Sequence, residues 1–329
     1  MKVLVTGGAG YIGSVTTLEL INQGYEVVVF DDLSFGHEQA IAKQAKFIKG
    51  DLLDRASIRS ALSNERIDAV VHFAGFIAVG ESVKEPLKYV QNNIIGGFNL
   101  IDSMRELKIG KIIFSSSAAV YGNPERVPIE EDDKKDPTNP YGETKLIFEK
   151  FLAWSNAAYG MRSVSLRYFN ASGADIQNGL GEDHDPETHL IPLILKVALA
   201  QREKIEIFGT DYDTPDGTCI RDYVHIKDLA AAHVLALKHL LEVGATSFYN
   251  VGSSKGYSVK EVIDMSRKIT GRDIKVVSSP RREGDPASLV ASSEKIQREL
   301  GFKFKHSGLE NIIKTAWEWH SKHPQGYKK

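Results

Sequence analysis

The sequence predicts an α/β protein with a doubly wound parallel sheet of the Rossmann type and a smaller, interleaved α/β domain towards the C-terminus. Short apolar runs rich in β-branched residues alternate with segments of helical periodicity through the first half of the chain. The runs are apolar without alternation, which is typical of parallel strands covered by helices on both faces. A glycine-rich turn separates the first run from the first helical segment. This order of elements predicts a parallel sheet with its ligand site at the carboxyl ends of the strands.

The expected strands of the sheet lie at 2–6, 26–30, 47–50, 69–73, 111–114 and 164–169. A first helix follows the glycine turn, and later crossover helices are expected at 55–63, 86–107 and 141–159. The pattern then loosens, and the expected elements are a helix at 191–202, a strand at 205–208, a helix at 228–241 and a strand at 247–251. We expect a dinucleotide-binding domain over 1–170, with a return of 223–252, and a discontinuous substrate domain over 171–329. The polar end of the chain, 320–329, is expected to be loosely held.

Composition excludes several classes of partner. The 41 lysines and arginines nearly balance 43 aspartates and glutamates, and no basic run stands out, so neither nucleic acid nor an anionic membrane is an expected partner. No apolar run approaches the roughly 20 residues of a membrane span, and the first residues do not resemble a leader peptide. Cys219 is the only cysteine, which excludes an internal disulfide. We expect a soluble, cytoplasmic protein.

The glycine turn has the spacing of a loop that binds a dinucleotide. Gly7, Gly10 and Gly13 allow a tight strand-to-helix turn and bring backbone N–H groups close to a pyrophosphate. Asp31 lies 18 residues after Gly13, where a carboxylate accepts the ribose hydroxyls and repels a 2′-phosphate. NAD is therefore favoured over NADP, with Asp32 as a second acid; a solvated turn is the alternative for both acids. Asp51 either flanks the adenine or caps the helix that follows it.

Tyr141 and Lys145 form the candidate catalytic pair. They lie four residues apart on an expected helix opened by Pro140, so their side chains share one face. An ammonium close to a phenol favours the phenolate, and we expect it to lower the pKa of Tyr141 towards neutrality and make this residue a general base. The serines at 115–117 end the fifth strand, where a hydroxyl can contact the same substrate oxygen. The alternative is a chance meeting of a surface tyrosine and lysine.

These motifs carry a family resemblance. TGGAGYIG at 6–13, HFAG at 72–75, SSSAAVYG at 115–122, YGETK at 141–145 and LRYFN at 166–170 resemble the extended short-chain dehydrogenase/reductase superfamily. Within it, GESV at 80–83, RDYVH at 221–225, RREGD at 281–285 and HPQGY at 323–327 are similar to the UDP-glucose 4-epimerase family, over the whole length of the chain.

The resemblance implies a reversible inversion at C4 of UDP-glucose and UDP-galactose, with NAD kept bound. Tyr141 would remove the proton of the 4′-hydroxyl, and Ser117 would steady the developing carbonyl. The residues implied at NAD, besides the glycines and acids above, are Tyr11, Ile12, Leu52, Phe73, Ala74, Gly75, Asn92 and Tyr168. Those implied at the UDP-sugar are Asn170, His189, Leu190, Phe208, Arg221, Tyr223, Arg282, Asp285 and Leu289. The resemblance also suggests a homodimer, with 86–108 and 141–160 as candidate interface segments.

The chain departs from the family pattern at three positions. Ile77 stands where many members carry a lysine near NAD, and His189 stands where many carry an asparagine at the diphosphate or sugar. Leu289 replaces the tyrosine that glucose-selective members carry beside the sugar. We therefore expect room for an N-acetyl group at C2, and activity on UDP-GlcNAc and UDP-GalNAc as well.

The sequence leaves other functions of the chain open. A dehydratase needs an acid pair after the serines of the fifth strand, where this chain has Ala118 and Ala119, which argues against it. A nucleotide-sugar reductase or dehydrogenase, and a non-catalytic NAD-binding protein, remain as alternatives. The two arginines of the later motifs could be surface ion pairs, Arg221 with Asp222 and Arg282 with Asp285. The polar cluster at 182–185 (EDHD) is expected to hold no metal, because the implied chemistry needs none.

Overall fold

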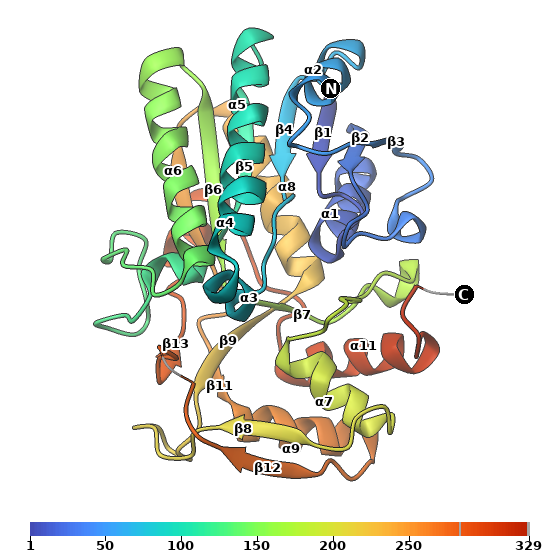
Figure 1. The fold of residues 1–329 in the computed structure, drawn as a ribbon, viewed down its shortest axis with the longest axis vertical. Coiled ribbons are helices and arrows are strands. Elements are labelled where there is room, and N and C mark those ends of the chain that lie inside the picture. The colour runs from blue at the N-terminus through green and yellow to red at the C-terminus, as the bar shows by residue number, and fades with distance from the viewer. Residues whose placement is uncertain (283, 328–329) are drawn as a thin grey trace.

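The large sheet of the protein is fully parallel and is wound in two directions. The computed structural model describes residues 1–282 and 284–327. In this part of the chain seven strands form one sheet in the order β10-β6-β5-β4-β1-β2-β3 (Figure 1). The strands are β1 (Lys2–Thr6), β2 (Glu26–Asp31), β3 (Lys46–Lys49), β4 (Ala69–His72), β5 (Lys111–Ser117), β6 (Arg162–Tyr168) and β10 (Ser247–Val251). The chain order reverses between β1 and β4, which is the switch point where such sheets bind ligands.

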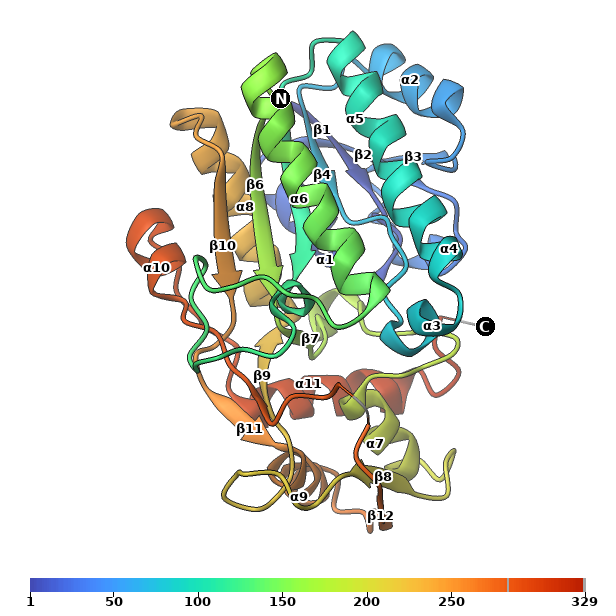
Figure 2. The ribbon, with the colours of Figure 1, turned by 60° about the vertical axis from the view of Figure 1, so that its left-hand side comes forward.

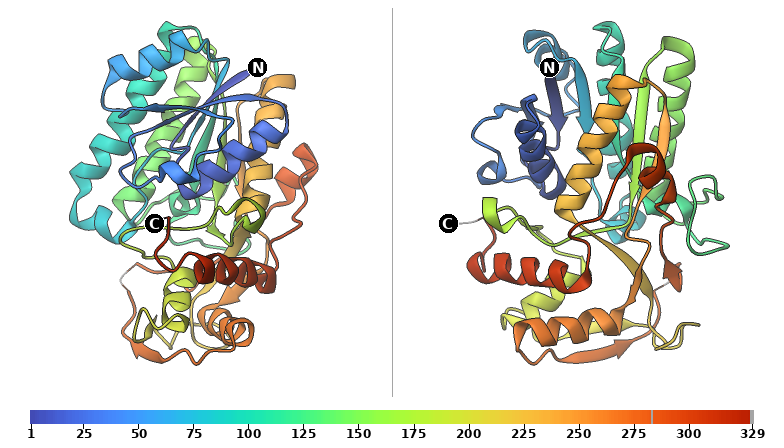
Figure 3. Two further views of the ribbon diagram at one scale, coloured as in Figure 1. Left: turned by 90° about the vertical axis from the view of Figure 1, so that its right-hand side faces the viewer. Right: turned by 180° about the vertical axis from the view of Figure 1, so that it is seen from behind.

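Helices cover both faces of this sheet, as the unbroken apolar runs predict. On one face, Val3 and Val5 of β1 pack in a core shared with α1 (Tyr11–Asn22) and α8 (Ile226–Glu242), which lie side by side in Figure 3. On the other face, Leu4 packs in a second core. That core is shared with α2 (Arg55–Asn64), α5 (Gly96–Glu106) and α6 (Pro140–Tyr159). Alternate residues of one strand therefore serve two separate cores.

Two helices differ from the sequence-based expectation. The segment expected as one helix over 86–107 consists of α4 (Pro86–Tyr89), a π-helical turn (Val90–Ile95) and α5. In this turn Asn93 accepts a hydrogen bond from the backbone N–H of Phe76 at 2.8 Å and donates one to its carbonyl at 3.0 Å, a side-chain tie that periodicity does not reveal. The helix expected to reach 202 is α7 (Leu190–Ala198); it ends early, and Ala200 has a left-handed φ of 58°.

The second lobe lies beyond the carboxyl edge of the large sheet (Figure 2). Its strand β9 (Ile220–His225) pairs with β7 (Asn170–Ser172), β11 (Gly256–Ser258) and β13 (Ser288–Leu289). Two further strands, β8 (Ile205–Phe208) and β12 (Val276–Ser279), pair in parallel.

The other helices of the described chain are α3 (Val79–Lys84), α9 (Val259–Thr270), α10 (Glu294–Leu300) and α11 (Leu309–Lys322). Short 3₁₀ turns lie at Glu38–Ala40, Ala118–Tyr121 and Ile176–Asn178.

The two lobes are interleaved in sequence. Strand β10 lies beside β6 in the large sheet, although it follows β9 of the second lobe. The boundaries given above for the two domains stay a prediction. Within the described residues, no helix is both long and apolar enough to cross a membrane.

The expectation of a loose C-terminal end is wrong for the described residues up to 327. Trp319 is buried, and its ring stacks on His323. The backbone N–H of Tyr327 donates to Asp183 at 2.9 Å, and its hydroxyl accepts from the backbone N–H of Gly181 at 3.0 Å. These bonds fasten the end of the chain to the segment before α7; residues 328 and 329 lie outside the described part.

Candidate active site

The predicted site residues gather where the sheet faces the second lobe. The arrowheads of the central strands point towards that lobe in Figures 1 and 2. The glycine turn follows β1, the HFAG motif spans the end of β4, and the three serines end β5. Because the carboxyl ends of parallel strands meet at one edge, segments distant in sequence lie together there.

Close approach explains the glycines of the first turn. Gly7 has a φ of 71°, and a Cβ there would lie 2.5 Å from the backbone nitrogen of Ala74. A Cβ at Gly13 would lie 2.1 Å from the carbonyl oxygen of Gly7. Helix α1 begins at Tyr11 behind the N-cap Gly10, and no side chain caps it. Its first backbone N–H groups, with the partial positive charge of the helix end, therefore suit a phosphate.

The two acids after β2 stabilise the turns around this loop. Asp31 is buried; its carboxylate accepts from the backbone N–H of Ala9 at 3.0 Å and of Leu33 at 2.9 Å. Burial raises the pKa of Asp31, and these two bonds oppose the shift. Asp32 accepts from the backbone N–H of Ser34 at 2.8 Å. Both acids thus lie beside the glycine loop and hold its connections in shape.

Asp51 does not cap the helix that follows it, so that alternative is wrong. Its side chain accepts from the backbone N–H of Leu53 at 2.8 Å and is exposed. The cap of α2 is Asp54, which accepts from Ala56 and Ser57 at 3.0 and 3.1 Å. Leu52 is buried in the core beneath α2. The exposed carboxylate of Asp51 is therefore free of a capping role.

The candidate catalytic pair lies in the first turns of α6. The helix begins at Pro140, and its N-cap Asn139 accepts from the backbone N–H of Gly142 at 2.9 Å. Tyr141 and Lys145 are 9% and 5% exposed, so neither is a surface residue. The Lys145 ammonium donates to the carbonyl of Ser115 at 2.9 Å and lies 5.8 Å from the centre of the Tyr141 ring.

Burial dominates the electrostatics of this pair. It raises the pKa of Tyr141, and a hydrogen bond with Ser117 opposes the rise. Burial also lowers the pKa of Lys145 to about 8, while Glu149 opposes the fall. Among the protein's own groups burial therefore outweighs the lowering of the Tyr141 pKa expected from Lys145, because burial opposes the phenolate and the ammonium alike.

Ser82 and Asn93 support the site, and the sequence analysis assigned neither of them a role. Ser82, within the GESV motif, accepts from the backbone N–H of Tyr141 at 3.2 Å and so braces the start of α6. The hydroxyl of Ser115 bonds that of Tyr168. Asn93 lies beside the HFAG segment and donates to Thr144 at 3.1 Å. Asn92, the predicted cofactor residue, is half-buried in the same π-helical turn.

The predicted substrate arginines do not form the surface ion pairs that were the alternative to a role at the diphosphate. Arg221 on β9 pairs with Asp285 at 2.5 Å, and the Arg282 guanidinium lies 3.9 Å from the centre of the Phe208 ring. Asp222 is instead buried and accepts from Ser253, Ser254 and Ala291; burial raises its pKa to about 6. Neither pairing of that alternative is found among the described residues; Arg221 joins β9 to the 281–285 segment, and Arg282 joins this segment to β8.

The other predicted substrate residues lie around β9 and the start of α7. Asn170 donates to the carbonyl of Asp222 at 2.8 Å, and Tyr223 is buried. Leu289 on β13 is paired with Arg221 and packs against a core cluster that contains Phe169. His189 and Leu190 open α7, with His189 as its N-cap.

The polar cluster in the folded chain has different members from the one at 182–185 in the sequence. Glu182 and His184 meet Glu187 and His189, and the ligating atoms of all four lie within 4.8 Å of one another. Burial opposes charge on both imidazoles, but the two carboxylates outweigh it and raise the pKa of His184 to about 9 and that of His189 to about 10. Asp183 contacts His37 at 3.3 Å instead.

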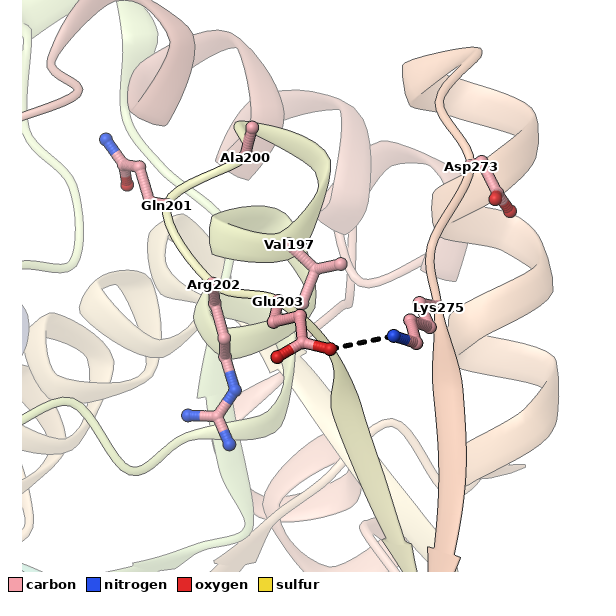
Figure 4. A pocket seen from close by; sticks show the side chains of 7 residues that line it. All are labelled: Val197, Ala200, Gln201, Arg202, Glu203, Asp273 and Lys275. Carbon is pink, nitrogen blue, oxygen red and sulfur yellow. Dashed lines mark hydrogen bonds and ion pairs between the residues drawn. The ribbon is translucent and has the colours of Figure 1, made fainter.

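A surface hollow of about 450 Å³ lies elsewhere, on the second lobe (Figure 4). Its walls come from the end of α7, the segment between α7 and β8 and the segment just before β12, and they include an ion pair between Glu203 and Lys275 at 2.7 Å. It contains none of the predicted site residues, so we do not assign it a role in the chemistry.

Comparison with known proteins decides the family. A model of the NAD dependent epimerase/dehydratase family matches residues 3–252. The UDP-glucose 4-epimerase of Halalkalibacterium halodurans is 53% identical over 327 residues, which cover 99% of this chain and 98% of that protein. The chain belongs to the UDP-glucose 4-epimerase family. The resemblance drawn from the motifs is thereby confirmed.

Solved structures of the epimerases agree with this fold. The UDP-glucose 4-epimerase from Brucella ovis in complex with NAD superposes with a TM-score of 0.94 at 48% identity, covering 96% of this chain and 97% of that one. The UDP-Glc/GlcNAc 4-epimerase from Campylobacter jejuni superposes with a TM-score of 0.86 at 41% identity, covering 98% and 99%. The predicted fold class, a Rossmann-type parallel sheet with a smaller α/β lobe, is confirmed.

The glycine loop of this epimerase-family chain allows a direct test. Replacing Gly13 by alanine forces its Cβ against the Gly7 carbonyl, so the loop must shift away from a pyrophosphate. We expect Gly13→Ala to retain less than about a tenth of the NAD of the wild type, at least roughly 1.4 kcal/mol of binding free energy. NAD released by denaturing the purified protein measures this. In Gly308→Ala, where a Cβ meets nothing within 4 Å, NAD content should be unchanged; equal NAD in all three proteins would contradict the argument.

Proposed function

We propose that this chain is a cytoplasmic enzyme that catalyses the reversible, NAD-dependent epimerisation of UDP-glucose and UDP-galactose at C4. The observation that carries the proposal is the buried pair Tyr141 and Lys145, which stands beside the end of β5. A dehydratase would need acids at 118 and 119, where this chain has alanines. Full-length relatives are UDP-glucose 4-epimerases, which supports the same reaction.

The edge of the sheet fits NAD. The uncapped start of α1 would face the pyrophosphate. The carboxylate of Asp31, next to Asp32, would accept hydrogen bonds from the adenosine ribose hydroxyls. The residues that hold the rest of the cofactor are Tyr11, Ile12, Asp51, Leu52, Phe73, Ala74, Gly75, Asn92 and Tyr168. When bound, NAD takes up a hydride and returns it, so no net oxidation occurs. The exposed Ile77 adds no charged contact to the cofactor.

Tyr141 moves the proton of the reaction. Its phenolate takes the proton of the 4′-hydroxyl as the C4 hydrogen departs as hydride, and the Ser117 hydroxyl bonds the resulting 4-keto oxygen. Burial raises the Tyr141 pKa, and the positive charges of Lys145 and of the bound nicotinamide would together oppose this rise and favour the phenolate; Lys145 would also bond the nicotinamide ribose. After the keto sugar turns its other face to the cofactor, Tyr141 gives the proton back and the configuration at C4 is inverted.

The second lobe binds the nucleotide. Arg221 and Arg282 contact the diphosphate, because two guanidinium groups match two phosphates. The Asp285 carboxylate accepts hydrogen bonds from the uridine ribose hydroxyls and also pairs with Arg221. The Phe208 ring lies against the uracil, and the Arg282 guanidinium packs on this ring. The residues that complete the sugar pocket are Asn170, His189, Leu190, Tyr223 and Leu289.

Removing the phenol tests the catalytic proposal. Tyr141→Phe deletes the base and keeps the ring, so the conversion of UDP-galactose should fall by about 10²–10⁴-fold while bound NAD is kept. Chromatography of the sugar nucleotides after incubation without added NAD measures the rate. Tyr159→Phe, at the exposed end of the same helix, is the matched control and should match the wild type.

The same assay separates the alternatives. A reductase or dehydrogenase would change the NADH absorbance in proportion to the substrate and would need added cofactor. A non-catalytic NAD-binding protein would leave both sugars unchanged. Undiminished conversion by Tyr141→Phe would remove this tyrosine from the mechanism.

We also propose that the enzyme accepts UDP-GlcNAc and UDP-GalNAc. Leu289 is half-buried on β13, beside Arg221 of β9. A leucine there is shorter than a tyrosine and lacks its hydroxyl, so it leaves space beside C2 of the sugar. One relative, from Campylobacter jejuni, carries both substrates in its name, UDP-Glc/GlcNAc 4-epimerase.

A tyrosine at this position should close the pocket. We expect Leu289→Tyr to lower the rate with UDP-GalNAc at least about tenfold and to leave the rate with UDP-galactose within about twofold, since one clash of this kind is worth roughly 1–3 kcal/mol. Leu289→Met conserves volume and should keep both activities. An equal loss of both activities in the tyrosine variant would refute the role of Leu289.

We further propose a homodimer built on the face of α3, α4, the π-helical turn Val90–Ile95 and α6. Large apolar side chains are exposed along this face, where α3 and α4 both contact α6. They are Val83 (61% exposed), Leu87 (76%), Ile95 (45%), Phe151 (37%) and Trp154 (61%). Except for α3, these elements lie in the segments that the resemblance suggests as an interface, 86–108 and 141–160.

A charge on this face should separate the subunits. We expect Trp154→Glu to elute as a monomer where the wild type is a dimer, because a carboxylate in an apolar interface loses its hydration. Light scattering during gel filtration measures the mass. Val243→Glu changes an equally exposed apolar residue outside this face and should remain dimeric; a wild-type monomer would contradict the proposal.

A further inference from the structure

Four side chains converge between the sheet edge and α7. His189 Nδ1 lies 2.9 Å from Glu182 Oε1 and 2.9 Å from Glu187 Oε1. His184 Nδ1 lies 3.4 Å from Glu182 Oε1 and 3.7 Å from Glu187 Oε2. Two imidazole nitrogens and two carboxylates thus surround one point.

The spacing suits a four-coordinate metal ion. Zn²⁺ binds imidazole nitrogen at about 2.0–2.1 Å and carboxylate oxygen at about 2.0–2.2 Å, so neighbouring ligands of a tetrahedral ion lie about 3.3 Å apart. The four nitrogen–oxygen distances above lie on either side of this value, and all four ligating atoms are within 4.8 Å of one another, so small side-chain movements would bring them to the spacing of a tetrahedral ion. Mixed nitrogen and oxygen ligands favour a divalent transition metal over Mg²⁺ or Ca²⁺, which prefer oxygen alone.

The burial and the charge of these side chains also favour a bound cation. The side chains of Glu182 and Glu187 are 6% and 2% exposed, and both carboxylates lie 2.9 Å from the same nitrogen, His189 Nδ1. A divalent cation would take the place of the imidazole protons in balancing the two carboxylates. His184 Nδ1 is buried and makes no close hydrogen bond among the described residues; it lies 3.4 and 3.7 Å from the two carboxylates, so this nitrogen faces the centre of the cluster.

The surrounding contacts hold the ligands in place. Glu187 Oε1 accepts from the backbone N–H groups of Thr188 and His189 at 2.7 and 2.8 Å, which orients the carboxylate and leaves Oε2 towards His184. The His184 ring lies edge-on to Tyr11, at the first residue of α1. The yellow-green chain before α7 passes close to this end of α1 in Figure 1.

We infer that Glu182, His184, Glu187 and His189 form a binding site for a divalent transition metal ion, with Zn²⁺ as the best match. This revises the sequence-based expectation of no metal, because Glu187 and His189 join the cluster only in the folded chain. The ion has a structural role: it fastens the segment before α7 beside the start of α1. Metal on Nδ1 of His189 leaves Nε2–H free to donate to the UDP-sugar, and this last consequence alone rests on the proposed function.

Zinc binding to the intact protein tests the inference. The full chain, with its retained cofactor and without a histidine tag, is treated with a chelator and then titrated calorimetrically with Zn²⁺ or with Mg²⁺. We expect about one Zn²⁺ per chain and no Mg²⁺ binding. Glu182→Gln and His184→Gln should each weaken Zn²⁺ binding at least tenfold. His37→Gln removes an imidazole that contacts Asp183 of the same segment and should bind Zn²⁺ as the wild type does.

Two results of the titration, and one of a spectroscopic measurement, would overturn the inference. One is a wild type that binds no Zn²⁺, in which case protons alone neutralise the carboxylates. The other is Zn²⁺ binding that both ligand variants retain, which would place the ion elsewhere. Zinc-edge X-ray absorption of the wild type needs no variant to fold, and we expect only nitrogen and oxygen ligands, with imidazole among them; sulfur in the spectrum would contradict the site. Metal binding is measured directly, so its failure is distinct from a failure of the epimerase assay.

Discussion

A buried ion pair holds the helix of the candidate catalytic residues against the sheet. Arg167 on β6 donates through Nε and Nη2 to Glu149 on α6, at 2.9 and 2.7 Å, and the side chains are 3% and 2% exposed. Tyr141, Lys145 and Glu149 follow at intervals of four, so one face of α6 carries all three. Removing one partner of such a pair leaves an unpaired buried charge, which costs about 3–5 kcal/mol. The placement of the phenol at the strand edge depends on this anchor.

The ion pair extends into a network that reaches the last strand of the sheet. Ser116 on β5 donates to Glu149 at 2.6 Å, and Arg167 also donates to the hydroxyl of Tyr121 at 2.9 Å. That hydroxyl donates in turn to Asn250 on β10 at 2.7 Å. Strands β5, β6 and β10 and helix α6 are thus joined by satisfied polar groups in the interior. The chain must complete the second lobe and return as β10 before this network is complete.

Local patterns predicted much of the large sheet and part of the site. Unbroken apolar runs indicated its strands, and the glycine spacing indicated the loop before α1, because both depend on neighbours in sequence. Glu149 and Arg167 were missed, since a charge inside an apolar pattern gives no sign of a partner 18 residues away. Helix α9 was missed although its capping box, Ser258 with Glu261, is a readable signal. The short strands of the second lobe have too few residues for a periodicity to emerge.

By itself the sequence determined the fold class, the loop for a dinucleotide and the spacing of Tyr141 and Lys145, because each depends on residues within one or two turns of chain. The tertiary structure alone decided which charges pair. It joined Arg221 with Asp285 rather than Asp222, and it set the pKa of Lys145 by burial. It also assembled a cluster of two histidines and two glutamates from a polar loop. Charge interactions depend on distance and desolvation, and neither is fixed until distant segments pack together.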